Sequence, residues 1–570
     1  MIAKMTQYSF ILLHGDKEQF LTELQGLGVV DITRSAKPVD SYSQSLLDNI
    51  RTLREDISCT EKGMDDTLDG LLAVRDALAR DIEAARPWGN YDRERLSAFG
   101  GLHYYRVAAK KYDPAWEEQY PIQVVCDEDG DRWFVLVGDN AGFPVKELTA
   151  PQHTLSELEA LLQEQDAKVE AHRKILEGSK ADIPEMKHQI LHLESELDRY
   201  LAGTAAVPAA EDTIDTLVGF APTACDADVT DYLERAGVFY LKDEAKVEEN
   251  PPIKFNNNKF VKMFEILTDM YGRPAYDGFD PTPFIAVFFL LFFAFCMGDA
   301  GYGLVLVLLG LLLRKSAKDL APLVITLGAA TVVIGFLFHN FFSIDISQWP
   351  LFAPIQGVFI PAQIAGNDAT MILALAVGIL HICLAMVVKS VNAVRTNGFA
   401  ASLGTLGWTL LVVGGVTVAA VSLAGVLDAT LTRCIVIGLG VVSALGIFIF
   451  NDPKRNKLAN VGMGLWDTYN MITGLMGDVL SYLRLYALGL AGSMLGMAFN
   501  DMGKMVLGDG SNALLWIPFL LLVLVGHALN IAMCALGAFV HPLRLNFLEF
   551  FKNAGYEARG RKFNPLTNSK

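Results

Sequence analysis

Residues 282–313 read TPFIAVFFLLFFAFCMGDAGYGLVLVLLGLLL, and Asp299 is the one charged side chain among them. A membrane-spanning helix needs about 20 mostly apolar residues. We interpret this stretch as two short spans joined by the polar hinge Gly298–Gly303. Further apolar segments follow it, and together they predict eight spans. The segments lie at about 282–297, 300–313, 320–338, 371–388, 404–427, 434–450, 471–499 and 512–540.

The charge distribution divides the 570-residue chain near residue 280. Residues 1–280 hold 30 Lys and Arg against 52 Asp and Glu, a net charge of −22. Residues 281–570 hold 17 against 12, a net charge of +5. The sequence therefore predicts an acidic soluble domain followed by a membrane domain. This pattern excludes a wholly soluble enzyme, and the acidic surface argues against nucleic acid as a partner.

Two further features predict a cytoplasmic location for the acidic half. The seven cysteines are scattered and form no CxxC pair, so we expect reduced thiols in a reducing compartment. Residues 1–13 hold one short apolar run and no small-residue cleavage site. They do not match a signal peptide, so we expect the acidic half to stay in the cytoplasm.

The acidic half is predicted to be an α+β domain with two small α/β lobes and a helical arm. Residues 1–42 and 210–255 share a strand–helix–strand pattern and are expected to pair into a proximal lobe. Residues 91–151 look rich in β-strand and are expected to form a distal lobe. Apolar residues at spacings of three and four in 43–90 and 152–203 favour an antiparallel coiled-coil arm. The alternative is a pair of ordinary amphipathic helices packed on a globular core.

A domain of this kind is typical of a strut. The histidines of the acidic half share no arrangement typical of metal ligands, and no catalytic cluster is evident. We therefore expect no cofactor and no metal.

The placement of cations predicts the orientation of the membrane half. With a cytoplasmic N-terminus, thirteen Lys and Arg fall on the cytoplasmic side and two on the opposite side, which agrees with the positive-inside rule. We predict eight spans with both ends cytoplasmic. The cytoplasmic cations are Arg314, Lys315, Lys318, Lys389, Arg395, Lys454, Arg455, Lys457, Lys552, Arg559, Arg561, Lys562 and Lys570, and the opposite ones are Arg433 and Lys504.

Two arginines, Arg484 and Arg544, are not explained by this topology. Arg484 lies in VLSYLRLYAL, residues 479–488, where a charge normally lines a polar path or meets a partner charge. Small residues flank it at helical spacing, which favours close approach of another helix. They are Gly474, Gly477, Ser481, Ala487 and Ala491. The alternative is a structural arginine paired with an internal carboxylate such as Asp478 or Asp299.

Arg544 ends a polar stripe on one helical face. Its members follow at steps of three and four and predict a hydrophilic path along an otherwise apolar helix. They are His527, Asn530, Cys534, Gly537, His541 and Arg544. Each histidine alone is better explained by packing, and so is His381. Pro542 is expected to loosen the backbone locally, and the hinge Gly298–Gly303 lacks the β–α context of a phosphate-binding loop.

Several motifs together resemble one known family, subunit I (the a subunit) of V-type and A-type rotary ATPases. The motifs are PPIKFNN at 251–257, YGRP at 271–274, DPTP at 280–283, GDAGYG at 298–303, SYLRL at 481–485 and HPLRL at 541–545. Cys534 stands where eukaryotic relatives carry a carboxylate, which favours a bacterial or archaeal plasma membrane.

The resemblance implies a stator subunit that conducts protons or sodium ions. Arg484 would meet the buried carboxylate of each subunit in a rotating proteolipid (c/K) ring. Its charge would also repel cations and block direct leakage between two offset half-channels, and Arg544 would share this second task. The candidate half-channel residues are Ser481, His527, Asn530, His541, Asp299, Asp478 and Glu549. The last two spans would be long and tilted along the ring. The arm would bind peripheral-stalk subunits of the E/G type, the central-stalk-capping subunit of the d/C type would be a further partner of the chain, and ATP would bind elsewhere in the complex.

Two other classes of protein remain open on the residues alone. A self-contained secondary ion transporter with a cytoplasmic regulatory domain usually shows internal repeats and broken helices, and no convincing repeat is seen here. A purely structural membrane scaffold leaves both arginines unexplained.

Overall fold

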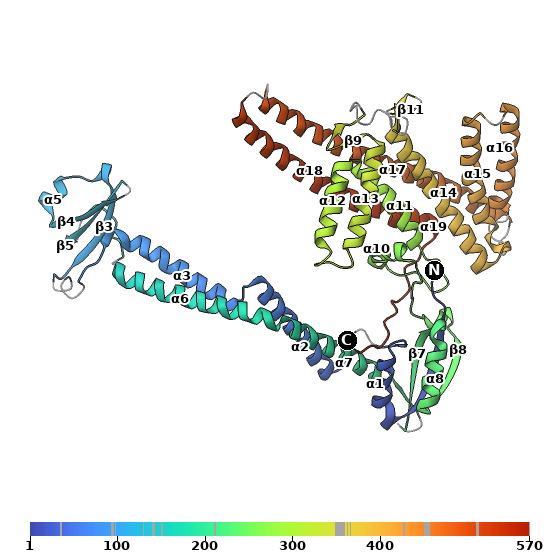
Figure 1. The fold of residues 1–570 in the computed structure, drawn as a ribbon, viewed down its shortest axis with the longest axis horizontal. Helices are drawn as coiled ribbons and strands as arrows, with labels where there is room; N and C mark the ends of the chain where they lie inside the picture. The colour runs from blue at the N-terminus through green and yellow to red at the C-terminus, as the bar shows by residue number, and fades with distance from the viewer. Residues whose placement is uncertain are drawn as a thin grey trace. The chain divides into compact units, whose positions relative to one another are not determined.

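The computed structural model describes most of the chain, and Figure 1 shows its ribbon. The residues outside the described part are 35–36, 93–95, 97–98, 129, 139–142, 150–151, 210–212, 348–358, 362, 365, 426–427, 450–456, 509–511 and 569–570. The chain divides into two compact units. The first comprises Met1–Ile11, Val29–Asp31 and Val218–Pro565, and the second comprises Leu12–Gly28, Ile32–Leu217 and Leu566–Lys570.

The second unit contains two antiparallel helix pairs (Figure 1). One pair is α2 (Ser41–Lys62) with α7 (Ile183–Thr204), and the other is α3 (Asp66–Ala85) with α6 (Leu155–Ser179). Apolar residues at helical spacing meet inside each pair, as the sequence predicts. They are Leu46, Ile50, Ile57, Ile190, Leu197 and Leu201 in the first pair, and Leu68, Val169 and Leu176 in the second. Coiled-coil packing of these helices stays a prediction.

Each of the two long helical stretches is interrupted near its middle. Helix α2 ends at Gly63, whose φ of 66° is left-handed, a conformation that glycine adopts without steric cost. Asp65 then caps α3 by accepting the Leu68 N–H at 2.7 Å, and His172 Nε2 of α6 lies 2.9 Å from Asp65 Oδ2. The opposite stretch breaks at the 3-10 turn Lys180–Asp182.

A three-stranded antiparallel sheet lies between α3 and α6 in the chain. Its strands β3 (Leu102–Ala108), β4 (Ile122–Glu128) and β5 (Asp131–Val137) have the order β3-β5-β4. With the short helix α5 (Ala115–Gln119), they bury Tyr105, Tyr112, Phe134 and Leu136. The β-rich character predicted for this part of the chain is confirmed.

A five-stranded sheet is assembled from two distant pieces of sequence. Its order is β2-β7-β1-β8, with β6 beside β7, and β1 pairs with β8 antiparallel. Strands from both pieces thus lie in one sheet. The elements are β1 (Met5–Leu13), α1 (Lys17–Leu27), β2 (Asp31–Ile32), β6 (Val207–Ala209), β7 (Ile214–Pro222), α8 (Asp226–Ala236) and β8 (Phe239–Glu244).

Apolar helices dominate the first unit, at the positions the sequence predicts. Five are long and apolar enough to cross a membrane: α14 (Ala369–Asn397), α15 (Leu403–Leu423), α16 (Ala429–Ala444), α17 (Lys457–Leu507) and α18 (Trp516–Arg544). Three are shorter: α11 (Thr282–Met297), α12 (Ala300–Leu313) and α13 (Ala321–Leu337). Aromatic and aliphatic side chains of α11, α14, α17 and α18 form the core between them.

Glycines bring α12 and α13 into close contact. A Cβ on Gly303 would lie 2.6 Å from the Val332 nitrogen, and one on Gly328 would lie 2.8 Å from the Val307 nitrogen, so neither position has room for a side chain. This agrees with the interpretation of Gly298–Gly303 as a hinge for tight helix packing rather than a phosphate-binding loop.

Short elements complete the first unit. The helices α9 (Lys259–Lys262) and α10 (Glu265–Tyr271) precede α11, and α19 (Phe551–Ala554) follows α18 after the π-helical turn Leu545–Phe550. Two small hairpins, β9 (Asn340–Phe341) with β10 (Ile344–Asp345) and β11 (Gln363–Ile364) with β12 (Asn367–Asp368), lie between α13 and α14.

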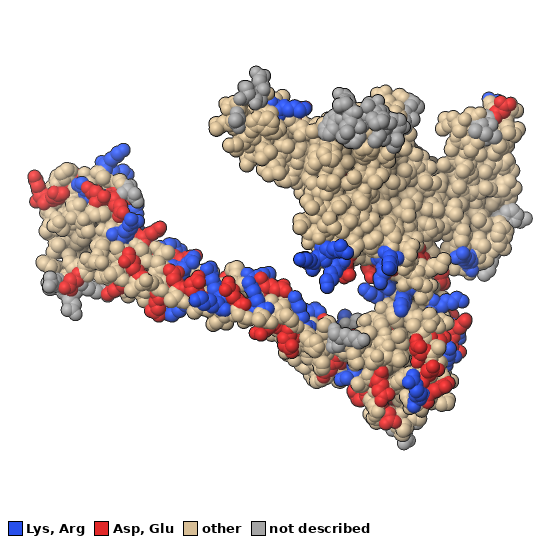
Figure 2. Space-filling view, viewed as in Figure 1, with Lys and Arg blue, Asp and Glu red and all other residues tan. Residues whose placement is uncertain are grey.

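The surface of the helical bundle is almost free of charge over a broad band. Figure 2 shows this band in tan, with Lys and Arg side chains gathered along its lower edge. Large apolar side chains such as Leu524 and Leu536 of α18 are two-thirds exposed. Such a surface is suited to the hydrocarbon core of a bilayer.

Candidate functional site

Arg484 lies near the middle of α17, a helix of 51 residues. The side chain is half-buried, and its Nη1 atom is buried without a hydrogen-bond partner. No carboxylate lies within 4 Å of either Arg484 or Arg544 in the described part of the chain. An uncompensated cation in an apolar helix costs several kcal/mol or more, so it is normally retained for a function.

The two carboxylates considered as internal partners for Arg484 are engaged elsewhere. Asp478 accepts hydrogen bonds from Lys552 Nζ at 3.2 Å and from Asn553 Nδ2 at 2.8 Å. Asp299 accepts four backbone N–H groups, as described below. The structure therefore does not contain the structural ion pair that was the alternative explanation for Arg484.

Asp299 accepts several hydrogen bonds from the backbone around the start of α12. Only 1% of its surface is exposed. Its Oδ1 accepts the N–H groups of Gly301 at 2.8 Å, Tyr302 at 3.2 Å and Phe342 at 2.9 Å, and its Oδ2 accepts that of Ser343 at 2.6 Å. These bonds cap the helix and hold the β9–β10 hairpin against it, which is a structural task.

The small residues beside Arg484 form an open strip. Gly477, Ala487 and Ala491 are exposed, and a Cβ on Gly477 would meet no atom within 4 Å. Ser481 is half-buried and donates its hydroxyl to the Gly477 carbonyl at 3.0 Å. Because no other described helix of the chain covers the strip at Gly477, it is accessible to a helix from outside the chain.

The end of α18 brings a second cation to the same region. His541 lies within Coulombic range of both Arg484 and Arg544, and its Nδ1 atom is buried without a partner. Arg544 itself is exposed. Helix α18 continues through Pro542 and changes to the π-helical turn Leu545–Phe550 directly after Arg544, and π-helical turns occur frequently at functional sites.

The two halves of the polar stripe of α18 have different surroundings. Its first half belongs to a hydrogen-bond network centred on Tyr302 of α12, which is 1% exposed. His527 Nδ1 lies 2.8 Å from Tyr302 Oη, and Asn530 donates to the same oxygen at 2.8 Å. Asn530 also donates to the Gly492 carbonyl of α17 at 2.8 Å, and Cys534 donates to Asn530. Its second half, His541 and Arg544, lies near Arg484.

Two further groups, Glu549 of the π-helical turn and Asn553 of α19, lie with Asp478 on the other side of Arg484. Glu549 is 5% exposed, and its Oε2 atom is buried without a partner. Asn553 donates to both Asp478 and the Glu549 carbonyl. Asp478 and Glu549 thus mark one end of the site, and Asn530 and His527 mark the other.

His381 has the packing role expected for it. It is fully buried, with its ring 4.2 Å from that of Phe288 and 4.7 Å from that of Phe550. Its Nδ1 atom lies 3.0 Å from Tyr482 Oη, which fixes the ring beside α17.

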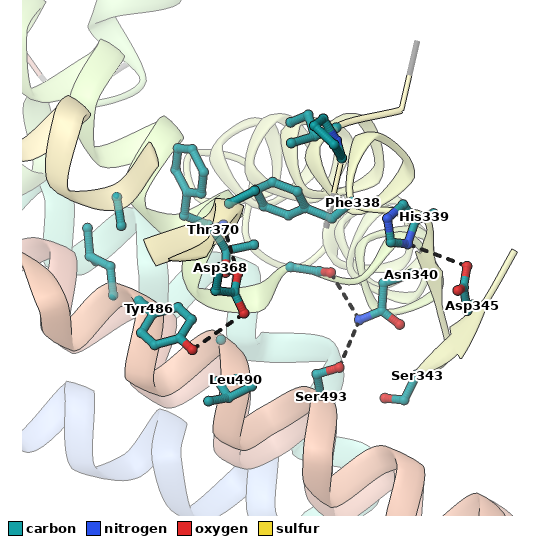
Figure 3. Close-up of a pocket in the computed structure, with 18 of the residues that line it drawn as sticks. Phe338, His339, Asn340, Ser343, Asp345, Asp368, Thr370, Tyr486, Leu490 and Ser493 are labelled. Carbon is teal, nitrogen blue, oxygen red and sulfur yellow. Dashed lines mark hydrogen bonds and ion pairs between the residues drawn. The ribbon is translucent and has the colours of Figure 1, made fainter. Parts of the chain in front are cut away.

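A cavity of about 280 Å³ opens beside the α17 turn that follows Arg484 (Figure 3). Tyr486 donates to Asp368 Oδ2 at 3.4 Å, and Asn340 donates to Ser493 Oγ at 3.3 Å. His339 Nδ1 lies 3.4 Å from Asp345. Burial alone would raise the pKa of Asp345, but hydrogen bonds from Ser347 outweigh it and lower the pKa.

Sequence reasoning missed Tyr302 and the polar side chains of this cavity. Tyr302 lies within the motif GDAGYG, in which only the glycines and the acid were assigned a role from the sequence. Several polar residues of the cavity, such as His339, Asn340 and Asp345, come from the segment between α13 and α14 and carry no periodic signal. Among the described residues, no group of three or more His, Cys, Asp or Glu side chains is arranged to hold a metal ion.

These apolar helices, with polar and cationic side chains buried among them, define an integral membrane protein. Within that class, the chain belongs to the V-type ATPase 116kDa subunit family, whose model matches residues 146–347 and 467–568, more than half of the chain. The resemblance drawn from its motifs is thereby confirmed.

Several curated relatives agree with this assignment. The chain is 32% identical over 349 residues to the A-type ATP synthase subunit I of Methanocaldococcus jannaschii, which covers 56% of the chain and 49% of that relative. It is 26% identical to the V-type ATP synthase subunit I 1 of Treponema pallidum, over 85% of the chain and 82% of the relative. With the V-type ATP synthase subunit I of Borreliella burgdorferi, it is 22% identical over the full length of both. The chain spans about half the length of the archaeal relatives it matches.

Proposed function

We propose that this chain is the stator subunit of a V/A-type rotary ATPase or ATP synthase and forms the transmembrane ion path together with a proteolipid ring. The observation that carries the proposal is Arg484, a cation inside an apolar helix with no carboxylate of the described residues within 4 Å, beside a strip of small residues open to another helix. A ring helix with one buried carboxylate would supply both the missing charge and the missing packing surface.

The electrostatics of such an encounter account for ion release. A fixed cation in a medium of low dielectric constant favours the ionised form of a nearby carboxylate. A ring carboxylate that arrives at Arg484 would therefore give up its proton or sodium ion. The same positive charge, reinforced by Arg544, would repel free cations and prevent a direct leak.

The polar groups on either side of Arg484 suit two offset half-channels. Asp478 precedes Arg484 by six residues, and Gly492, which bonds to Asn530, follows it by eight, so the two groups lie about 9 and 12 Å away along the helix. We assign Asp478 and Glu549, with Ser481, to the cytoplasmic side. His527 and Asn530 and the cavity at Asp368 belong to the other side, while His541 lies beside the arginines. Asp299 is assigned its structural role, because its acceptor sites are filled.

The proposed topology has eight spans with both ends in the cytoplasm. The Lys and Arg side chains along one edge of the apolar surface in Figure 2 agree with it. Three of the thirteen cations counted for that side, Lys454, Arg455 and Lys570, lie outside the described residues. At about 1.5 Å per residue, α17 is about 76 Å long against a hydrocarbon core of about 30 Å, so a steep tilt is required.

The soluble helix pairs would connect the stator to the rest of the complex. Their surfaces carry matched charges and no catalytic cluster among the described residues, which suits a strut. We propose that they bind peripheral-stalk subunits of the E/G type and the central-stalk-capping subunit of the d/C type, and that ATP chemistry takes place in other subunits.

The substitution Arg484→Ala tests this function. In membrane vesicles that carry the whole complex, we expect ATP-driven ion transport to be abolished, because no other cation would ionise the ring carboxylate at that position. Arg433→Ala, at an exposed arginine of α16, is the matched control and should keep transport. Transport retained in Arg484→Ala would contradict the proposal, and transport that needs no ATP-hydrolysing subunits would favour a secondary transporter instead.

A further inference from the structure

The chain after α19, residues 555–565 and hereafter the tail, runs along the segment that leads into α11. Tyr556 Oη donates to the Gly272 carbonyl at 2.7 Å, and the Gly560 N–H donates to the Arg273 carbonyl at 3.0 Å. Ile253 then exchanges backbone hydrogen bonds with the tail, at 2.8 and 3.2 Å. All these residues belong to the same compact unit.

The contact at Gly560 leaves no room for a side chain. A Cβ on Gly560 would lie 2.0 Å from the Pro274 carbonyl oxygen. At Gly560 the tail therefore packs against backbone atoms and not against flexible side chains. Its path is fixed at this point.

The end of the tail contacts a buried carboxylate. Asp31 of β2 is 1% exposed, and it accepts Arg561 Nη1 at 3.3 Å and the Asn564 N–H at 3.0 Å. The Arg561 guanidinium also lies 5.4 Å above the Phe220 ring of β7. A buried carboxylate is costly unless it is paired and hydrogen-bonded, so removal of the tail cation would take a charged partner away from Asp31.

The tail is continuous with the helix that carries Arg544. Helix α18, the π-helical turn and α19 run without interruption from Trp516 to Ala554, and Gly555 ends them with a left-handed φ of 67°. An anchor at Asp31 therefore acts on α18 through a short, seated segment rather than through a free linker.

We propose that the tail is a tether that positions α18: the pairing of Arg561 and Asn564 with Asp31 sets the position of the end of α18, and thereby of His541 and Arg544 beside Arg484. Asp31, Arg561 and Asn564 are positioning residues in this scheme, and they touch no transported ion. The inference rests on the proposed function for its consequence, since a displaced Arg544 matters only to an ion path.

The first test measures coupling in the assembled complex. In vesicles, Arg561→Gln should keep ATP hydrolysis but lower the membrane potential generated per ATP by about tenfold, because a displacement of about 1 Å in an active arrangement costs that much or more. Arg561→Lys, which retains the cation, should restore part of the loss. Arg559→Gln, at a tail arginine that is 76% exposed, should leave coupling unchanged. Normal coupling in Arg561→Gln would overturn the proposal.

The second test reads the position of α18 without any ion transport. In the full-length chain, Gly492→Cys on α17 would face native Cys534 on α18, since a Cβ at Gly492 meets Cys534 Sγ. We expect disulfide formation, measured by mass spectrometry, to be several-fold slower when Arg561→Gln is added. Asn564→Pro, which removes the N–H donor to Asp31 together with the amide side chain, serves if Arg561→Gln does not accumulate. An unchanged rate overturns the tether, whereas failure of the Arg484→Ala test overturns only the ion path.

Discussion

Asp299 and Arg484 are both charged residues of the apolar helices, but the chain surrounds them in opposite ways. Asp299 is 1% exposed and receives four backbone N–H groups from α12 and the β9–β10 hairpin. Arg484 has a buried nitrogen with no partner, and no carboxylate of the described chain lies within 4 Å of it. A satisfied buried charge holds a structure together, whereas an unsatisfied one is costly and indicates a partner outside the chain.

The comparison predicts that loss of Asp299 has the largest effect on stability. Asp299→Ala leaves four buried N–H groups without an acceptor, and we expect a loss of about 3 to 5 kcal/mol in the free energy of unfolding. Thermal unfolding of the purified chain in mild detergent measures this. Asp319→Ala, at an exposed acid in the α12–α13 connection, is the control and should unfold like the wild type. If Asp299→Ala were as stable as Asp319→Ala, the hydrogen bonds to Asp299 would not have the structural role assigned to them.

A smaller loss of stability is expected on substitution of Asp65, a hydrogen-bonded carboxylate in the helix pairs of the second unit. Burial alone would raise the pKa of Asp65, but the Leu68 N–H and His172 outweigh it and lower the pKa. The stabilisation is therefore present above the ordinary Asp value of about 4 and is lost as the pH falls through the lower folded-state pKa. Asp65→Asn retains a helix cap but loses the carboxylate charge at the helix N-terminus and beside His172, which in this partly exposed position contributes about 0.5 to 1 kcal/mol.

Hydrogen exchange at the start of α3 measures the Asp65 contribution. At neutral pH, the wild type should be better protected than Asp65→Asn, and the difference should shrink toward pH 3. A difference of the same size at both values would show that the charge of Asp65 contributes nothing.

Much of the fold could be predicted because apolar run length and charge are local properties of the sequence. The membrane-capable apolar helices were predicted from run length, and two matching strand–helix–strand patterns predicted that the two distant pieces come together. The breaks near Gly63 and Lys180 were not predicted, because a left-handed residue and a 3-10 turn interrupt the helices without interrupting their apolar spacing.

The site was predicted only in part. Helical spacing grouped His527, Asn530 and His541 on one face of α18, and the structure agrees that they share a face. Helical spacing does not show which neighbours a long helix contacts along its length. In the structure, one end of the stripe contacts Tyr302 and the other end lies near Arg484. The cavity at Asp368 and the anchor at Asp31 depend on contacts between distant segments, which no local pattern encodes.

The central claim is that the face of α17 around Arg484 meets a proteolipid helix. The most direct measurement replaces exposed Ala487 with the photoreactive residue benzoylphenylalanine in the assembled complex, with the same residue at exposed Ile437 of α16 as the control. After irradiation and mass spectrometry, the account predicts an adduct of this chain with the proteolipid subunit from position 487 and none from position 437. Adducts from position 487 with lipid or with this chain alone would contradict it.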